Sequence, residues 1–203
     1  ISDPEKADFL DLYYVTGVSD ALDTELIINR MLAENPDVKT VGLLYSLSEP
    51  NSEKPIQQAK EILDAKGIAY VEATGNNNSE ISDAAISIYQ RVDAIFTPTD
   101  NVVMAAELTL AELFTASKVP HYTGADSFVR NGAFATCGVN YTALGQKAAD
   151  MAIEVLETGT VPAYHTMEGG IITVNTETAE AIGAAYTVFA SIGSLHEVVH
   201  TEA

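Results

Sequence analysis

Short apolar runs alternate with longer segments in which apolar residues recur every three or four positions, and this alternation covers the middle of the chain. The runs predict buried strands, and the periodic segments predict amphipathic helices. The predicted strands are Thr40–Tyr45, Ile68–Ala73, Asp93–Phe96, Val119–Thr123 and Ala133–Cys137. Strands that alternate with helices form a parallel sheet covered on both faces. Because βαβ crossovers are right-handed, the pattern predicts a doubly wound α/β fold for residues 38–137.

Polar capping residues and glycines mark where the predicted helices begin and end. These helices run from an Asp20 or Asp23 cap to Asn35, through Gln57 and Leu63 to Gly67, from a Ser79 cap through Ile88, from Val102 to Ser117, and from Gly124 to Asn131. Residues 1–16 show no clean periodicity.

From Val139 onward the pattern changes. The sequence predicts, in order, a helix over Tyr141–Glu157 that stops at Gly159, a loop over Thr160–Gly170, a strand over Ile171–Asn175 and a helix over Thr176–Ile182. The remainder, with Tyr186 and Phe189, is predicted to pack as another helix before a polar tail.

The composition of the 203 residues fits a globular protein, since 47% are hydrophobic and 19% are charged. The charge is strongly unbalanced, with 29 acidic and 10 basic residues and a net charge of −19. Such a chain repels phosphate backbones and anionic membranes, which argues against nucleic-acid binding. No segment reaches the roughly 18 consecutive apolar residues of a membrane helix, so this segment is not expected to insert into a membrane.

Recognisable catalytic, cofactor and metal motifs are absent from the sequence. The single Cys137 excludes an intramolecular disulfide and cysteine-rich zinc sites. His196 and His200 have a metal-ligand spacing, but without a third ligand they indicate a solvated tail. His121 falls in a predicted buried strand, where a hydrogen-bonded structural role is favoured. The sequence therefore predicts neither a cofactor nor a metal.

Small polar residues follow each of the first four predicted strands. These segments are Ser46–Ser52, Thr74–Ser79, Thr97–Asn101 and Gly124–Ser127. The carboxyl ends of parallel strands share one edge of the sheet, which is where ligands bind in open α/β folds. Such a rim suits a small zwitterion, whose carboxylate meets helix N-termini and whose ammonium meets Asp or Glu. The same residue types are also ordinary capping and turn residues, so both interpretations stay open.

Asp100 and Asp126 both follow strands and permit a second hypothesis. Facing each other across a crevice, they would form an acid/base pair or a magnesium site, as in receiver domains. Asp100 also directly precedes the helix start at Asn101, where a carboxylate caps the helix. Of these roles, an ammonium partner or a helix cap is favoured for Asp100 over acid/base chemistry.

Several segments, taken in order, resemble one protein family. They are Val15–Asp20, Val41–Tyr45 with Glu49, Asn51 and Ser52, Asp93–Asn101, Gly132–Gly145 and Val174–Asn175. The chain resembles the substrate-binding proteins of a bacterial ABC importer family with the type I periplasmic-binding-protein fold, which includes tryptophan/tyrosine-type binding proteins. The resemblance implies two Rossmann-like lobes joined by three crossovers.

The resemblance also implies a domain organisation. Residues 1–16 would be a hinge crossover, 17–137 the ligand-binding α/β lobe, 138–170 a helix and loop of the other lobe, and 171–203 a return across the hinge with a C-terminal helix and tail. About a hundred residues of the first lobe, with a lipoprotein signal, would precede Ile1. One nearly complete lobe implies weak or undetectable solute binding by these 203 residues alone.

The implied function is extracytoplasmic binding of a small solute, an amino acid and perhaps an aromatic one, by a periplasmic protein or a membrane-anchored lipoprotein. The implied partners are that solute and the ABC permease, and the work is closure and handover rather than a reaction. The candidate ligand-binding residues are Ser46, Glu49, Asn51, Ser52, Thr74, Asn78, Thr99, Asp100, Asn101 and Asp126. The alternatives are a sensor domain of the same fold, or a receiver- or flavodoxin-like enzyme using Asp100 and Asp126.

Overall fold

The computed structural model describes residues 13–202, which form two compact units. Unit 1 consists of the described residues up to Leu22 together with Val139–Gly169. Unit 2 consists of Asp23–Gly138 and the described residues from Gly170 onward. The chain therefore passes between the units at three places. Most of the predicted hinge segment 1–16 lies outside the described residues.

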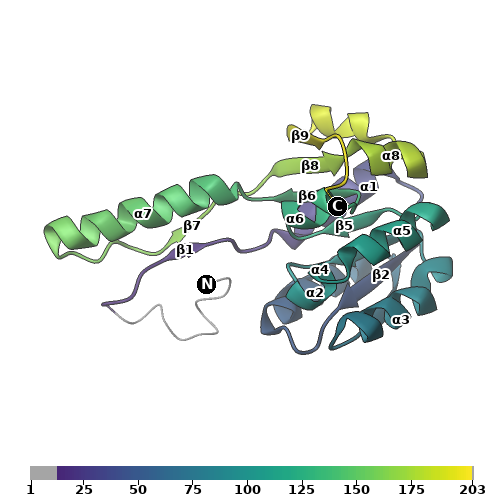
Figure 1. Ribbon diagram of the computed structural model, residues 1–203, viewed down its shortest axis with the longest axis horizontal. Coiled ribbons are helices and arrows are strands. Elements are labelled where there is room, and N and C mark those ends of the chain that lie inside the picture. Colours follow the sequence, from purple (N-terminus) through teal and green to yellow (C-terminus); the bar gives the residue numbers. More distant parts are fainter. Residues whose placement is uncertain (1–12, 203) are drawn as a thin grey trace. The chain divides into compact units, whose positions relative to one another are not determined.

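A mixed seven-stranded sheet forms the centre of unit 2 (Figure 1). Its strands are β2 (Thr40–Tyr45), β3 (Ala69–Thr74), β4 (Ala94–Thr97), β5 (His121–Thr123), β6 (Ala135–Gly138), β8 (Ile171–Asn175) and β9 (Ser194–Val198), in the order β3-β2-β4-β5-β6-β8-β9. The first five strands in this sheet order, β3, β2, β4, β5 and β6, are parallel, which confirms the sheet predicted for residues 38–137. β8 then runs antiparallel to β6, and β9 runs parallel to β8.

Helices connect these strands and cover both faces of the sheet. They are α1 (Thr24–Glu34), α2 (Pro50–Lys66), α3 (Asn78–Ile88), α4 (Asn101–Met104), α5 (Glu107–Ser117), α6 (Asp126–Arg130) and α8 (Thr176–Ile182), with short 3-10 helices η1 (Tyr89–Arg91) and η2 (Tyr186–Ser191). Of the two predicted caps for α1, Asp23 is the one used, because its carboxylate accepts a hydrogen bond from Leu26 N at 2.9 Å.

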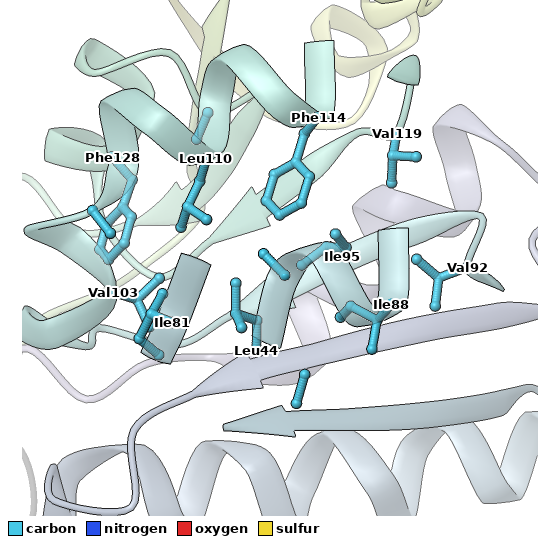
Figure 2. Close-up of a cluster of buried hydrophobic side chains, with 14 of the residues drawn as sticks. Leu44, Ile81, Ile88, Val92, Ile95, Val103, Leu110, Phe114, Val119 and Phe128 are labelled. Carbon is cyan, nitrogen blue, oxygen red and sulfur yellow. The ribbon is translucent and has the colours of Figure 1, made fainter. Parts of the chain in front are cut away.

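The alternation of side chains along each strand divides the core into two layers. Leu44 and Ile95 belong to a buried cluster that α3, α4, α5 and α6 cover (Figure 2). The neighbouring residues Leu43 and Phe96 are also fully buried, and they point to the opposite face, where α1 and α2 pack together. This arrangement explains the nearly continuous apolar runs of the central strands, since both faces of each strand are buried.

Unit 1 is a small two-layer piece. β1 (Val18–Ser19) pairs in parallel with β7 (His165–Thr166), and α7 (Tyr141–Thr158) packs against β1. The predicted loop over 160–170 therefore contains a short strand, which its length of two residues hid from the sequence pattern.

Two helix predictions were wrong in detail. Asn77, not Ser79, caps α3, because the Asn77 side chain accepts a hydrogen bond from Glu80 N at 3.1 Å. The single helix predicted over 102–117 is two helices, α4 and α5, with a break at Ala105–Ala106. Ala106 N bonds to Val103 O, three residues back, so the chain tightens there and α5 starts as a separate helix.

The predicted final helix and polar tail were also wrong. Residues 186–191 form only η2, and residues 194–198 form the edge strand β9, on which His196 lies. Most of β9 is exposed, so it lacks the apolar alternation that reveals a strand. Its backbone bonds to β8 supply the order instead.

Candidate functional site

The strand order of unit 2 reverses at β2. From β2 the chain crosses outward to β3 and then back to β4 on the other side of β2. The two crossovers leave the sheet in opposite directions, so a crevice opens beyond the carboxyl ends of β2 and β4. The segments that follow these two strands, Ser46–Ser52 and Pro98–Asn101, are those that carry most of the predicted site residues.

Asp100 joins these two segments from a buried position, with only 1% of the residue exposed. Its Oδ2 accepts hydrogen bonds from Ser46 N at 2.8 Å and from Ser52 Oγ at 2.7 Å. Its Oδ1 accepts bonds from Val102 N and Val103 N, each at 3.0 Å, and so caps α4. The four donors occupy the roughly four acceptor positions of a carboxylate. Asp100 therefore organises the edge.

Two further contacts link the same segments closer to the surface. Asn101 Nδ2 donates to Glu49 Oε2 at 3.0 Å, and Asn51 Nδ2 donates to the carbonyl of Thr99. Glu49 is half-buried and Asn101 is exposed. The predicted residues that follow β2 and β4 thus form one hydrogen-bonded edge with a carboxylate and a carboxamide at its surface.

A groove of about 340 Å³ lies beside this edge. It is lined by Tyr45, Ser46, Leu47, Glu49, Pro50, Glu53, Ile56, Gln57 and Lys60. Most of the lining residues were not predicted from the sequence, and among these Leu47 is distinctive because 68% of this apolar side chain is exposed on a loop of polar residues. An aliphatic residue within such a loop is a signal in the sequence that could have been used.

Two of the lining residues, Tyr45 and Lys60, belong to a polar network on β2, β3 and α2. Tyr45 OH donates to Glu72 Oε2 at 2.7 Å, and Lys60 Nζ lies 2.7 Å from the same oxygen. Burial, together with the Glu72 carboxylate, raises the pKa of Tyr45 to about 12. For Glu72, burial acts to raise the pKa, but the bonds from Lys60 and Tyr45 outweigh it and lower the pKa.

The remaining predicted residues lie apart from the linked segments. Thr74 is exposed at the end of β3, and Asn78 donates to Ala105 O at 3.2 Å, just beyond α4. Asp126 pairs with Arg130 at 3.3 Å, whereas Asp100 is held by the donors already described. The two aspartates therefore have separate partners, which does not fit an acid/base or magnesium pair.

A buried polar chain lies behind the edge. His121 is 2% exposed, with Nδ1 3.1 Å from Glu107 Oε1 and Nε2 2.8 Å from Thr97 Oγ1. The hydrogen-bonded structural role predicted for His121 is thereby confirmed. Burial raises the pKa of Glu107. The same residue types form charge-relay triads in hydrolases, but the Thr97 side chain is fully buried and no substrate reaches its hydroxyl.

Residues 13–202 contain neither a cluster of metal ligands nor a membrane-spanning helix. No group of three or more His, Cys, Asp or Glu in this part of the chain is arranged to hold a metal ion. Within the same residues, no helix combines the length and the apolar character that crossing a bilayer requires.

The fold and the edge define a class: an α/β protein with a crevice at its topological switch point, which is where open α/β folds bind ligands. The sequence pattern of the family described as "ABC transporter substrate binding protein" matches residues 11–187. The chain therefore belongs to this family. Membership confirms the predicted resemblance, and the family is one of solute-binding proteins rather than enzymes.

Similar proteins agree with this assignment. The chain is 29% identical over 171 residues to a tyrosine-binding protein of Clostridioides difficile, covering 83% of this chain and 49% of the relative. It thus spans about half the length of that curated relative.

Two solved structures are also similar. One is an ABC domain in complex with L-Trp from Streptococcus pneumonia, with 27% identity, a TM-score of 0.85 and coverage of 97% of this chain and 70% of the other. The other is a ligand-free, open substrate binding protein with adhesive properties from Clostridium difficile, with 26% identity, a TM-score of 0.77 and coverage of 97% and 69%. The predicted type I periplasmic-binding-protein fold is thereby confirmed.

Proposed function

We propose that the protein containing this chain is the extracytoplasmic solute-binding component of an ABC importer, and that its solute is an amino acid with an aromatic side chain. Two relatives support the solute class, since one is a tyrosine-binding protein and another was solved with L-Trp. The proposed partner is the importer's permease, and a membrane-anchored lipoprotein is the proposed form of the protein. The observation that carries the proposal is the Asp100-organised edge at the switch point.

Each part of an amino acid has a counterpart at this edge. Glu49 supplies a half-buried carboxylate for the ammonium group, and Asn101 orients that carboxylate through its 3.0 Å bond. α2 begins without a side-chain cap, so its first turn is free to face the ligand's carboxylate. The exposed Leu47 side chain offers an apolar surface for an aromatic ring.

The other predicted residues divide by their contacts. We propose that Ser46, Ser52 and Asp100 hold the edge in shape, since they are buried and bonded to one another. Asn51, Thr99 and Asn101 lie at its surface and are proposed to contact the solute. Thr74, Asn78 and Asp126 are proposed to contribute at the periphery of the crevice.

Binding depends on more than this edge. In the proposed mechanism, closure of two lobes buries the solute by contacts from both sides, and these residues span about half the length of the tyrosine-binding relative. We therefore expect the 203-residue chain alone to bind L-tyrosine and L-tryptophan weakly or not detectably. Calorimetry that finds micromolar or tighter binding of either amino acid to this chain would contradict that expectation.

The experiment that tests the function compares all twenty amino acids by thermal shift and calorimetry, using the full-length protein. Stabilisation by L-tyrosine or L-tryptophan, and not by the small aliphatic amino acids, is expected. Glu49→Gln should weaken that binding at least tenfold, because it removes the charge that faces the ammonium group. Asp64→Asn, an exposed change at the far end of α2, is the matched control and should leave binding unchanged. If Glu49→Gln binds the amino acid as tightly as the Asp64→Asn control does, Glu49 is not part of the binding site.

A further inference from the structure

One face of α2 forms a wall of the groove. The lining residues that belong to this helix recur every three or four positions, and they are Pro50, Glu53, Ile56, Gln57 and Lys60. Residues at this spacing share one face of a helix. The groove therefore runs along α2 from Glu49, the N-cap residue, to Lys60, which lies about three turns and roughly 16 Å further along the helix axis.

The two ends of the groove differ from its middle. Glu49 brings a carboxylate to the first end, and Lys60 brings an ammonium group to the second. Ile56 lies between them on the same face of α2, and the exposed side chain of Leu47 adds apolar surface. A solute that spans the groove thus meets a polar group at each end and an apolar side chain between them.

The Lys60 end carries a fixed pair of hydrogen-bonding groups. Lys60 Nζ and Tyr45 OH both lie 2.7 Å from the same oxygen, Glu72 Oε2, so the ammonium and hydroxyl groups are held side by side. The pKa of Tyr45, raised to about 12, keeps its hydroxyl protonated at neutral pH, and that proton is donated to Glu72. The phenol oxygen can still accept a hydrogen bond, and a lysine ammonium has three donors, of which the contact with Glu72 uses one.

An acceptor beside a donor matches a hydroxyl group, which both donates and accepts. Such a group would donate to the Tyr45 oxygen and accept from Lys60. Glu72 already balances the charge of Lys60, so this end favours a neutral group over an ion. Stability by itself is a weak explanation for the network, because 37% of the Glu72 side chain is exposed and ion pairs at such positions contribute little.

We propose that Tyr45 and Lys60 form a specificity-determining subsite that binds a hydroxyl group on the aromatic ring of the solute, so that the protein selects a phenol over an unsubstituted phenyl ring. The proposal rests on the proposed function, in which Glu49 binds the ammonium group of the same solute. The ring then lies along Ile56, and the far side of the ring reaches the Lys60 end of the groove.

Calorimetry on the full-length protein tests the subsite with L-tyrosine and L-phenylalanine, which differ by one hydroxyl group. Tyrosine should bind at least tenfold more tightly, because phenylalanine displaces water from Lys60 and Tyr45 without replacing its hydrogen bonds. A third ligand, 4-methoxy-L-phenylalanine, keeps the oxygen but lacks the proton. It should bind no more tightly than phenylalanine, because it cannot donate to the Tyr45 oxygen.

Replacement of Lys60 separates a specificity role from a structural one. Lys60→Met should weaken tyrosine binding at least tenfold and change phenylalanine binding by less than about twofold, whereas a distorted groove would weaken both. Lys60→Arg keeps a cationic donor and should retain a preference for tyrosine. Lys66→Met, the same substitution at an exposed position in the last turn of α2, is the control and should alter neither affinity.

Equal affinities of the unaltered protein for tyrosine and phenylalanine would overturn the subsite and leave the amino-acid function standing. A loss of both affinities in Lys60→Met would also overturn it. A full-length protein that binds neither amino acid would overturn the proposed function, and the subsite with it. Binding of phenylalanine by the unaltered protein therefore distinguishes failure of the subsite from failure of the function.

Discussion

Replacement of Asp100 tests the central claim about the binding edge. In Asp100→Asn one oxygen still caps α4, but the amide nitrogen that replaces the other oxygen cannot accept from Ser46 N or Ser52 Oγ. Ser52 can rotate its hydroxyl to accept instead, whereas Ser46 N–H is fully buried and loses its acceptor. Loss of a bond to a charged group and a buried donor without a partner together cost about 2–4 kcal/mol.

Asp100→Ala removes the α4 cap as well, which adds about 1 kcal/mol to the loss. The unfolding free energy of Asp100→Ala should therefore be lower than that of Asp100→Asn. For a chain of this length each kcal/mol corresponds to roughly 2–4 °C in melting temperature, so Asp100→Asn should lower it by roughly 4–16 °C.

Urea unfolding followed by circular dichroism measures this effect, with Asp64→Asn as an exposed control that should change stability by no more than about 0.5 kcal/mol. Ser52→Ala and the double variant complete a cycle, in which Asp100 and Ser52 should couple by about 1 kcal/mol or more. If Asp100→Asn costs less than about 1 kcal/mol, the buried bonds are readily replaced by water and the organising role of Asp100 is refuted.

Three shorter predictions follow from other contacts. Burial raises the pKa of Glu107 in the folded chain above its ordinary value of 4.5, so the native state holds a proton that the unfolded state has lost. Unfolding free energy should therefore fall as pH rises above about 4.5, and Glu107→Gln should flatten that slope in urea titrations from pH 4 to 8. Gly124→Ala should destabilise by about 1–3 kcal/mol, because the new Cβ would lie 2.5 Å from Thr99 N. In Gly145→Ala the new Cβ meets nothing within 4 Å, so this change should stabilise α7 by about 0.5–1 kcal/mol. Calorimetric melting should therefore show a higher melting temperature for Gly145→Ala and a lower one for Gly124→Ala.

The parallel part of the sheet was predictable because the sequence signals are local. Each central strand is buried on both faces and reads as an apolar run, and each helix shows its period beside a polar or glycine boundary. β9 escaped prediction because an exposed edge strand is ordered by backbone bonds to β8, which leave no trace in side-chain pattern. The break between α4 and α5 also escaped prediction, since the helical periodicity of apolar residues continues across Ala105–Ala106.

The sequence predicted which edge of the sheet carries the candidate site, but not which side chains contact one another there. Residues that follow strands must gather at the carboxyl edge of a parallel sheet, and this holds for Ser46, Glu49 and Asp100. The pairing among them depends on strand order: β4 lies next to β2 although β3 comes between them in the chain. Only that adjacency brings Asp100 to Ser46 and Ser52, and it leaves Asp126 to pair with Arg130.

The amino-acid sequence by itself determined the class of fold, the edge that carries the polar residues and the absence of a recognisable catalytic motif, because these follow from local periodicity and residue type. The tertiary structure decided which polar side chains are fully hydrogen-bonded within the protein and which remain accessible to a ligand. Asp100 looks like a ligand group in the sequence, but its carboxylate is filled by four protein donors, while the neighbouring Glu49 and Asn101 stay at the surface. A carboxylate has few acceptor positions, and only three-dimensional neighbours determine how many are already used.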